Sequence, residues 1–567
     1  MRIRTILMGV ILGAFFLSTL WLVFGIPTIF NSPDENANYY FTSVVALKDA
    51  PTEILNDDLG GLLHPRSVVA IGTSLAPRSF LGLPIIFGFI GRLFNLFNSI
   101  DGVLVLTPIL AILALLAWRS TIFKLFHDSI IADLSALFLM LHPAFWYYSA
   151  RTMMHNVGFV AFLIFALWFL LVCPWQQWSK GLLKSRYVDF ALAGICIGLA
   201  LAFRTSEVIW VFASFSILAF IAIRRKWVSL GQALIAVVSI VVLLAPFAVA
   251  NKSIYGDYFT TGYTVDTSVA SAVGAYEGDG LAATPLLESE VIETRISLFD
   301  EPMPGVFAYL FPFGIHELAI VRHIWQYCFW LYPWMSVFAI VGLVLALTQV
   351  QGQKLKAKSQ QLRAFAIYTL VLSTWLAVVY GSWSFYDNPD PSAITIGNSY
   401  VRYWLPVFVL STPFMAVGVK WLSERFKPKK VQNVILVAVV LLCAGFSGYR
   451  VFQGDDGLIA TREHLLEFYE KKVIVLQATE DDAIIIVDRA DKFLWPDRRV
   501  VVPLRSEATY SALPKMLENV AVYYFGITLP EADLNYLNLD KLGKAELRID
   551  LVLTVGDESL YRILKIE

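Results

Sequence analysis

Residues 31–40 read Asn-Ser-Pro-Asp-Glu-Asn-Ala-Asn-Tyr-Tyr and follow directly on an apolar run over residues 6–30. At about 1.5 Å per residue, that run is long enough to cross a bilayer as a helix. The Ser-Pro pair is typical of a helix start, so Asp34 and Glu35 are predicted to lie one or two turns outside the hydrocarbon. Paired acids at this depth suit chemistry on a lipid-borne headgroup. They equally suit a capped juxtamembrane helix, because the helix dipole favours acids near its N-terminus.

The composition is that of an integral membrane protein. Hydrophobic residues make up 57% of the chain and aromatic residues 14%, with a mean hydropathy of +0.64. The net charge of −1 excludes a global basic field of the kind that attracts nucleic acid. The two arginines before the first apolar run predict a retained signal anchor with a cytoplasmic N-terminus. The four cysteines lie in apolar segments without a CxxC spacing and are interpreted as small core residues.

The chain is predicted to be an α-helical polytopic membrane protein with about eleven transmembrane helices. Ten runs of spanning length follow the first one, at 101–118, 130–149, 156–174, 187–203, 207–223, 229–250, 324–348, 363–383, 402–421 and 431–451. The segment 80–97 is also apolar. The short basic loops all fall on the cytoplasmic side only if that segment does not cross, so we expect it to lie as a helix on the outer surface.

Two domains are expected. Residues 1–451 form a transmembrane catalytic module, whose outer loops include 31–100 with the acidic pair and 251–322. Residues 452–567 form a small soluble α/β domain, with the C-terminus on the extracytoplasmic side of the plasma (cell) membrane. Its expected elements are strands at 483–487, 499–502, 521–525 and 551–554, with helical patterns around 507–519 and 531–547. The tail has no GxGxxG or P-loop motif, so no nucleotide is assigned to it.

Ionisable residues gather at the predicted outer ends of the spans, where they are costly unless they have partners or a function. Besides Asp34 and Glu35, the candidates are Arg66, Arg78, Arg151, His155, Arg204, Arg402 and the neighbouring Tyr403. Guanidinium groups bind phosphate bidentately, and a carboxylate can take the proton of an incoming hydroxyl. The combination suits transfer of a group from a lipid phosphate.

The order of these motifs resembles the GT-C superfamily of polyprenyl-phosphate-sugar-dependent glycosyltransferases. It is most similar to the branch of protein O-mannosyltransferases and the lipid A aminoarabinose transferase. The matching features are the acidic pair, the helix at 80–97, an Arg-Thr-Met-Met-His-Asn stretch at 151–156, a Gly-Leu-Ala run ending at Arg204 and the Arg-Tyr-Trp-Leu-Pro stretch at 402–406. Two features depart from the family: its acid in the second loop is Asn156 here, and the tail lacks β-trefoil repeats.

The resemblance implies a membrane glycosyltransferase that moves a sugar from a polyprenyl-phosphate carrier to a hydroxyl on a protein, lipid or glycan acceptor. The expected reaction is an inverting displacement on the extracytoplasmic side, with Asp34 as general base. Glu35 would assist it or bind a divalent cation, although a lone acidic pair is far short of a metal site and no metal is assigned. Arg204 and Arg402 would hold the phosphate. The alternatives are a local pair of Arg204 with Glu207, and an interfacial Arg402 that snorkels to the membrane surface.

Two other classes of function stay open. One is a transporter or flippase of a lipid-linked substrate, although transporters favour carboxylates at the bilayer midplane and internal repeats, and this sequence shows neither. The other is a non-catalytic membrane scaffold that presents the tail. In the glycosyltransferase reading, the tail would help to bind or position the acceptor.

Overall fold

The structure is a computed structural model, and it describes residues 2–55, 59, 61–95, 100–172, 186–265, 310–348, 356–383, 393–518 and 520–566. The chain divides into two compact units. The first unit comprises Met1–Leu22, Val105–Ala245 and Asp279–Ala460; the second comprises Val23–Leu104, Pro246–Gly278 and Thr461–Glu567. The first outer loop thus belongs to the same unit as the tail.

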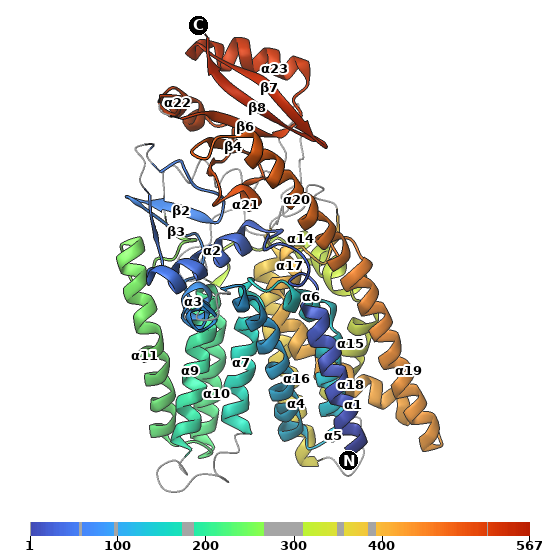
Figure 1. Cartoon of the computed structure of the whole chain (residues 1–567). Coiled ribbons are helices and arrows are strands. Elements are labelled where there is room, and N and C mark those ends of the chain that lie inside the picture. Colours follow the sequence, from blue (N-terminus) through green and yellow to red (C-terminus); the bar gives the residue numbers. More distant parts are fainter. Residues whose placement is uncertain are drawn as a thin grey trace. The chain divides into compact units, whose positions relative to one another are not determined.

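The first unit is a bundle of apolar helices (Figure 1). Its elements are α1 (Arg2–Thr19), α4 (Leu106–Phe126), α5 (Ser129–Leu141), α6 (Pro143–Ala150), α7 (His155–Leu171), α9 (Tyr187–Phe203), α10 (Val208–Arg224), most of α11 (Leu230–Tyr255), α14 (Glu317–Ile324), α15 (Pro333–Thr348), α16 (Lys356–Gly381), α17 (Ser399–Tyr403), α18 (Leu405–Glu424) and α19 (Lys429–Gly448). Helix α7 packs between α4 and α9, and α18 packs against α5 and α15.

Within the described residues, six helices are long and apolar enough to cross a membrane, and eight if each of two bent helix pairs counts as one span. Four shorter apolar helices accompany them, at Met8–Thr19, Gly82–Asn95, His155–Leu171 and Tyr187–Phe203. The protein is therefore an integral membrane protein, and the predicted fold class is confirmed. The count of eleven spans stays a prediction, as does the cytoplasmic side of the N-terminus.

Two of the predicted spans are broken helices. The run 130–149 forms α5 and α6, which meet at an angle of 54°, and the run 324–348 lies within a second pair bent by 104°. Each second piece begins at a proline, Pro143 or Pro333. Proline removes a backbone donor and disfavours helical geometry in the residue before it, so the chain turns at these points.

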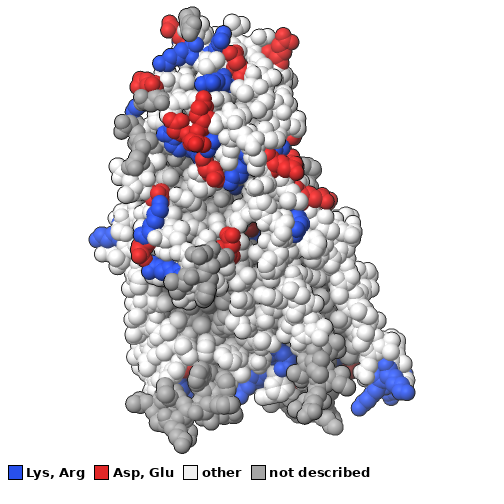
Figure 2. Space-filling model, viewed as in Figure 1, with Lys and Arg blue, Asp and Glu red and all other residues white. Residues whose placement is uncertain are grey.

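The surface of the bundle suits contact with lipid. On the face displayed in Figure 2, charged side chains gather over the elements of the second unit, while the bundle is almost free of them over most of its length. Its outer helices expose large apolar side chains, among them Val242 on α11 with 65% and Leu441 on α19 with 65% of their surface. Apolar surface exposed on this scale belongs in a bilayer rather than in water.

The tail forms a five-stranded sheet in the order β5-β4-β6-β8-β7. Its strands are β4 (Ile484–Val487), β5 (Arg499–Val501), β6 (Val522–Ile527), β7 (Leu547–Val555) and β8 (Glu558–Lys565). Strands β5, β4 and β6 are parallel, and β8 runs antiparallel to both β6 and β7. The accompanying helices are α20 (Leu458–Ala478), α21 (Asp491–Leu494), α22 (Glu507–Met516) and α23 (Glu531–Tyr536). The small C-terminal α/β sheet domain of the predicted fold is thus present.

The first outer loop contributes its own elements to the second unit. They are α2 (Pro33–Lys48), three short strands, β1 (Glu53–Ile54), β2 (Val68–Ile71) and β3 (Ser74–Pro77), and α3 (Gly82–Asn95). Helix α3 lies within the segment 80–97, which was expected to be a surface helix. The last part of that segment lies outside the described residues. It packs closely along α2, because Gly88 leaves room for Val45.

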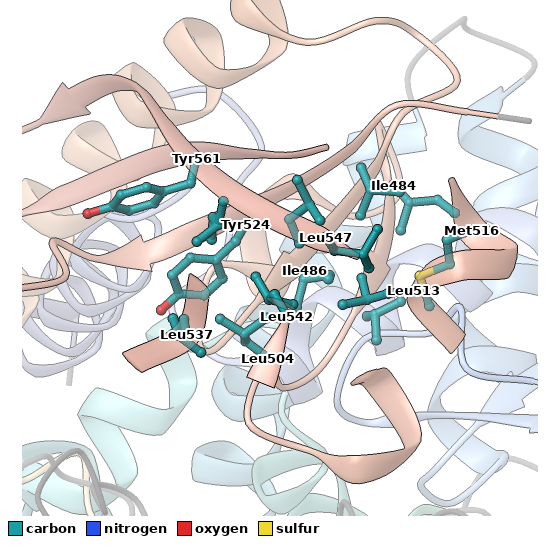
Figure 3. Packing of buried hydrophobic residues seen from close by; sticks show 14 of the residues in the cluster. Ile484, Ile486, Leu504, Leu513, Met516, Tyr524, Leu537, Leu542, Leu547 and Tyr561 are labelled. Atoms are coloured by element: carbon teal, nitrogen blue, oxygen red, sulfur yellow. The ribbon is translucent and has the colours of Figure 1, made fainter. Parts of the chain in front are cut away.

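The core of the tail includes a piece of the first loop. Figure 3 shows Ile484 and Ile486 of β4, Leu513 of α22 and Tyr524 of β6 pointing toward one another. Leu63, which is 3% exposed, belongs to the same cluster of buried side chains. Other leucines of the first loop pack against this cluster. Burial of a leucine contributes about 1.5–3 kcal/mol, so the loop and the sheet stabilise each other.

Candidate functional site

The acidic pair lies at the start of α2. The Oγ atom of Ser32 accepts a hydrogen bond of 3.2 Å from the backbone N–H of Asp34, and Pro33 occupies the first helical position. The predicted cap is therefore present, and it leaves the carboxylate of Asp34 available for other contacts. Asp34 is half-buried, whereas Glu35 is only 3% exposed.

A serine from elsewhere in the loop contacts the carboxylate of Asp34. The hydroxyl of Ser67 donates a hydrogen bond of 2.6 Å to Oδ1 of Asp34. The backbone of Ser67 has φ = 59°, a left-handed conformation that is uncommon for any residue except glycine, asparagine and aspartate. Its carbonyl accepts a bond of 2.9 Å from the N–H of Arg78. A strained, buried serine held at both ends fixes the direction of its hydroxyl.

The residue before this serine is held by the tail. The guanidinium of Arg66 donates to both carboxylate oxygens of Asp491, with its shortest bond 2.6 Å from Nη2 to Oδ1. The backbone N–H of Arg66 also donates to Asp491, at 2.8 Å to Oδ2. The side chain of Asp491 has 0% exposure, and that of Arg66 has 21%. Removing either partner of such a pair would leave an uncompensated charge.

Several basic residues surround Asp491, but not all of them are fully charged near neutral pH. Burial, together with the charge of Arg66, lowers the pKa of Lys492 to about 7. Its Nζ lies 4.0 Å from the ring centroid of Phe468. Burial also lowers the pKa of His64 below its ordinary value. Near neutral pH, the charged group that bonds directly to Asp491 is Arg66.

Helix α2 makes two further contacts with the tail. The side-chain amide of Asn36 donates to the carbonyl of Trp495 at 3.0 Å. The rings of Tyr40 and Trp495 lie 4.2 Å apart between centroids. These contacts hold the part of α2 after the acidic pair close to the segment that follows α21.

In the first unit, Arg402 lies on the short helix α17. Its Nε and Nη2 donate to Oγ of Ser399 at 3.0 and 2.7 Å, and its Nη1 lies 3.5 Å from Sδ of Met154. The side chain of Asn156 donates to the carbonyl of Arg402 at 3.2 Å. Asn156 thus fastens α17 to the start of α7.

A buried polar network surrounds Arg204, at the C-terminal end of α9. Its Nη2 donates to Oε1 of Glu207 at 2.6 Å, and the two side chains are 6% and 3% exposed. The same carboxylate accepts bonds from Tyr380 and Trp210, both at 2.5 Å. The local ion pair considered from the sequence is therefore formed. Three donors satisfy the carboxylate, as a buried charge requires.

Tyr403 brings the two candidate arginines together. The guanidinium carbon of Arg204 lies 4.5 Å from the centroid of its ring, and that of Arg402 lies 5.3 Å away. Tyr380 stacks on the same ring, with 4.7 Å between the centroids. Two guanidinium groups thus lie about one aromatic ring, with the charge of Arg204 compensated by Glu207.

Arg151 ends α6 and His155 begins α7, and each is 5% exposed. Nη1 of Arg151 donates to the hydroxyl of Tyr147 at 2.9 Å, and Tyr148 bonds the backbone at Asn398, just before α17. The junction of α6 and α7 therefore adjoins the segment that carries Arg402.

Sequence reasoning missed Ser67, Asp491 and Ser399. Only Asp491 had a usable signal, because it follows the buried strand β4, and ligands and functional groups in α/β sheets gather at carboxyl ends of strands. The predicted outer loop 251–322 lies outside the described residues over 266–309. Within the described ranges, no group of three or more His, Cys, Asp or Glu side chains is placed to hold a metal ion.

The chain was compared with known proteins after this geometry was established. No family model matches it, and no curated protein matches it. Among solved structures it is similar to ArnT from Cupriavidus metallidurans in the apo state, with 10% identity, a TM-score of 0.55 and coverage of 99% of this chain and 97% of that one. It also matches the Archaeoglobus fulgidus oligosaccharyltransferase in the apo form, with 12% identity, a TM-score of 0.46 and coverage of 91% and 69%. The likeness to ArnT extends over nearly the whole length of both chains, so the expected GT-C type fold is confirmed.

Proposed function

We propose that this protein is a membrane glycosyltransferase that moves a sugar from a polyprenyl-phosphate carrier to a hydroxyl acceptor. The observation that carries the proposal is the carboxylate of Asp34, which lies at the start of the helix that follows the first apolar run and is held by Ser67. The GT-C fold, which extends over 99% of the chain, supports the same reaction class. The proposed site faces the extracytoplasmic side.

In the proposed reaction, the acceptor oxygen attacks the anomeric carbon of the sugar. The bond between that carbon and the phosphate oxygen breaks, and its electron pair leaves with the polyprenyl phosphate. Asp34 takes the proton of the acceptor hydroxyl. Because the acceptor attacks in a single displacement from the face opposite the leaving phosphate, the new glycosidic bond has inverted configuration. Glu35 is proposed to assist Asp34 from its buried position.

For the first unit, we propose that Arg402 and Arg204 stabilise the negative charge that grows on the phosphate, with Tyr403 keeping their spacing. Arg402 is half-buried and donates to the hydroxyl of Ser399, whereas Arg204 is paired with Glu207. Arg151 and His155 are proposed to contact the donor or the acceptor, as are Arg66 and Arg78 in the second unit.

The test is a panel of radiolabelled polyprenyl-phosphate sugars in vesicles that contain the protein and crude acceptor from the host membrane. Release of free polyprenyl phosphate above vesicles without the protein is expected for at least one sugar. A transporter would instead move the intact lipid-linked sugar between leaflets without releasing the phosphate. That result, or equal release with and without protein, would overturn the proposal.

Arg402→Lys tests the proposed phosphate contact. We expect about a 10–100-fold loss of turnover, because a lysine supplies a point charge but neither the planar fork nor the paired bonds to Ser399. The measurement is release of polyprenyl phosphate at saturating donor. Arg425→Lys, at the opposite end of α18 from α17, is the matched control and should keep normal turnover. Near-normal turnover of Arg402→Lys would remove this role.

A further inference from the structure

We propose that Asp491, in the C-terminal sheet domain, is a positioning residue for the acid of the first loop, acting through Arg66 and Ser67. The inference rests on the proposed function, in which Asp34 is the general base. It gives the tail a part in the reaction itself: the tail sets the direction and the protonation state of the base.

The first step is the hold on Arg66. A single carboxylate with 0% exposure accepts one backbone and three side-chain hydrogen bonds from this residue. The guanidinium also donates to the carbonyl of Arg489, at 3.2 Å. Both groups of Arg66, the backbone N–H and the side chain, are therefore fixed to the segment that follows β4. Charge-assisted bonds of this kind are roughly twice as strong as neutral ones.

The second step is the link from Arg66 to its neighbour. Ser67 is 6% exposed and stands at φ = 59°, where a non-glycine residue costs about 1–3 kcal/mol and persists only when its surroundings hold it. The bonds on Arg66 hold the chain before this residue, and the bond from Arg78 holds the carbonyl after it. Without Asp491, the left-handed conformation would lose its support on one side.

The third step is the effect on Asp34. The hydroxyl of Ser67 donates to its Oδ1 at 2.6 Å, which favours the charged form of the carboxylate and fixes its plane. A base must be deprotonated before it can accept the acceptor's proton. The hydrogen bond therefore keeps Asp34 deprotonated, and able to act as a base, down to a lower pH.

Two variants test the chain of contacts in the full-length protein in membranes. Ser67→Gly removes the hydroxyl and keeps a residue that accepts φ = 59°, so folding is preserved. Asp491→Asn keeps the shape and removes the charge that holds Arg66. In both, the acid limb of the pH profile of kcat/KM should move to higher pH by about one unit, and kcat should fall about tenfold with little change in donor KM. A merely structural role would not move the pH limb.

Asp533→Asn is the control. Asp533 is an exposed acid of the same domain that pairs with Arg505 at 3.7 Å, and its variant should show the wild-type profile. An unchanged acid limb in both Ser67→Gly and Asp491→Asn, beside an Asp34→Asn enzyme that has lost turnover, would overturn the positioning role alone. Turnover that does not depend on Asp34 would remove Asp34 as the base, whereas release of polyprenyl phosphate that is equal with and without the protein would overturn the proposed function itself.

Hydrogen exchange gives a readout that does not need turnover. The amide of Arg66 donates to Asp491, so Asp491→Asn should speed its exchange about tenfold or more, while β4 and β6 keep their protection. Unchanged exchange at Arg66 would show that Asp491 does not hold the loop, and would overturn the proposal whatever the assay with donors shows.

Discussion

Asp34→Asn is expected to lower sugar transfer by about 10²–10⁴-fold, the range that a positioned general base contributes. The asparagine keeps the size of the side chain, and its carbonyl oxygen can still accept the hydrogen bond from Ser67. It cannot take a proton from the acceptor. We therefore expect donor binding close to that of the wild type and a loss confined to kcat, measured as release of polyprenyl phosphate at saturating donor.

Asp49→Asn is the matched control for this loss. It removes the same charge from the other end of α2, where the Asp49 side chain is 75% exposed and pairs with Arg92. Its transfer rate should stay close to normal, because an exposed ion pair contributes little. Equal rates of Asp34→Asn and Asp49→Asn would remove Asp34 as the base and shift attention to Glu35.

Glu207→Gln is expected to destabilise the helical unit by about 3–5 kcal/mol, the cost of leaving a buried charge without its counter-charge. Glu207 is the counter-charge of Arg204 and accepts further bonds from Tyr380 and Trp210. The neutral amide has one acceptor oxygen for these donors, and its NH₂ group faces the guanidinium. The measurement is the fraction of protein that remains monodisperse in detergent after heating, followed by size-exclusion chromatography.

Glu424→Gln separates this effect from a general loss of negative charge. Glu424 is 58% exposed and lies 3.7 Å from Lys420, so its replacement should cost about 0–1 kcal/mol. If the two variants had the same heat stability, the pair with Glu207 would not be a stabilising element. That result would favour the proposed contact of Arg204 with phosphate.

Local signals in the sequence predicted the local structure well. The Ser-Pro pair before Asp34 predicts a capped helix start, and α2 begins there because capping and proline geometry act within a few residues. The run at 484–487 predicts a buried strand, and β4 is buried along its length. The strand β8 at 558–565 was missed, because the alternation of polar and apolar residues in it is weak.

The contacts that shape the candidate site could not be predicted in this way. Arg66 and Asp491 lie 425 residues apart, and no periodicity or spacing in a single sequence links them. The left-handed backbone of Ser67 also had no signal, since such positions are usually marked by glycine or asparagine. The tail was expected to bind or position the acceptor. The hold of Asp491 on Arg66 adds a proposed task, the orientation of the acidic pair.

The burial of Leu63 in the core of the tail has a consequence for how the chain is made. A ribosome adds roughly 5–20 residues per second, so the leucine-rich piece of the first loop is finished some tens of seconds before the strands that cover it. During that delay its apolar side chains are without their final partners. Arg66 can form its bonds to Asp491 only after the first part of the tail has been synthesised.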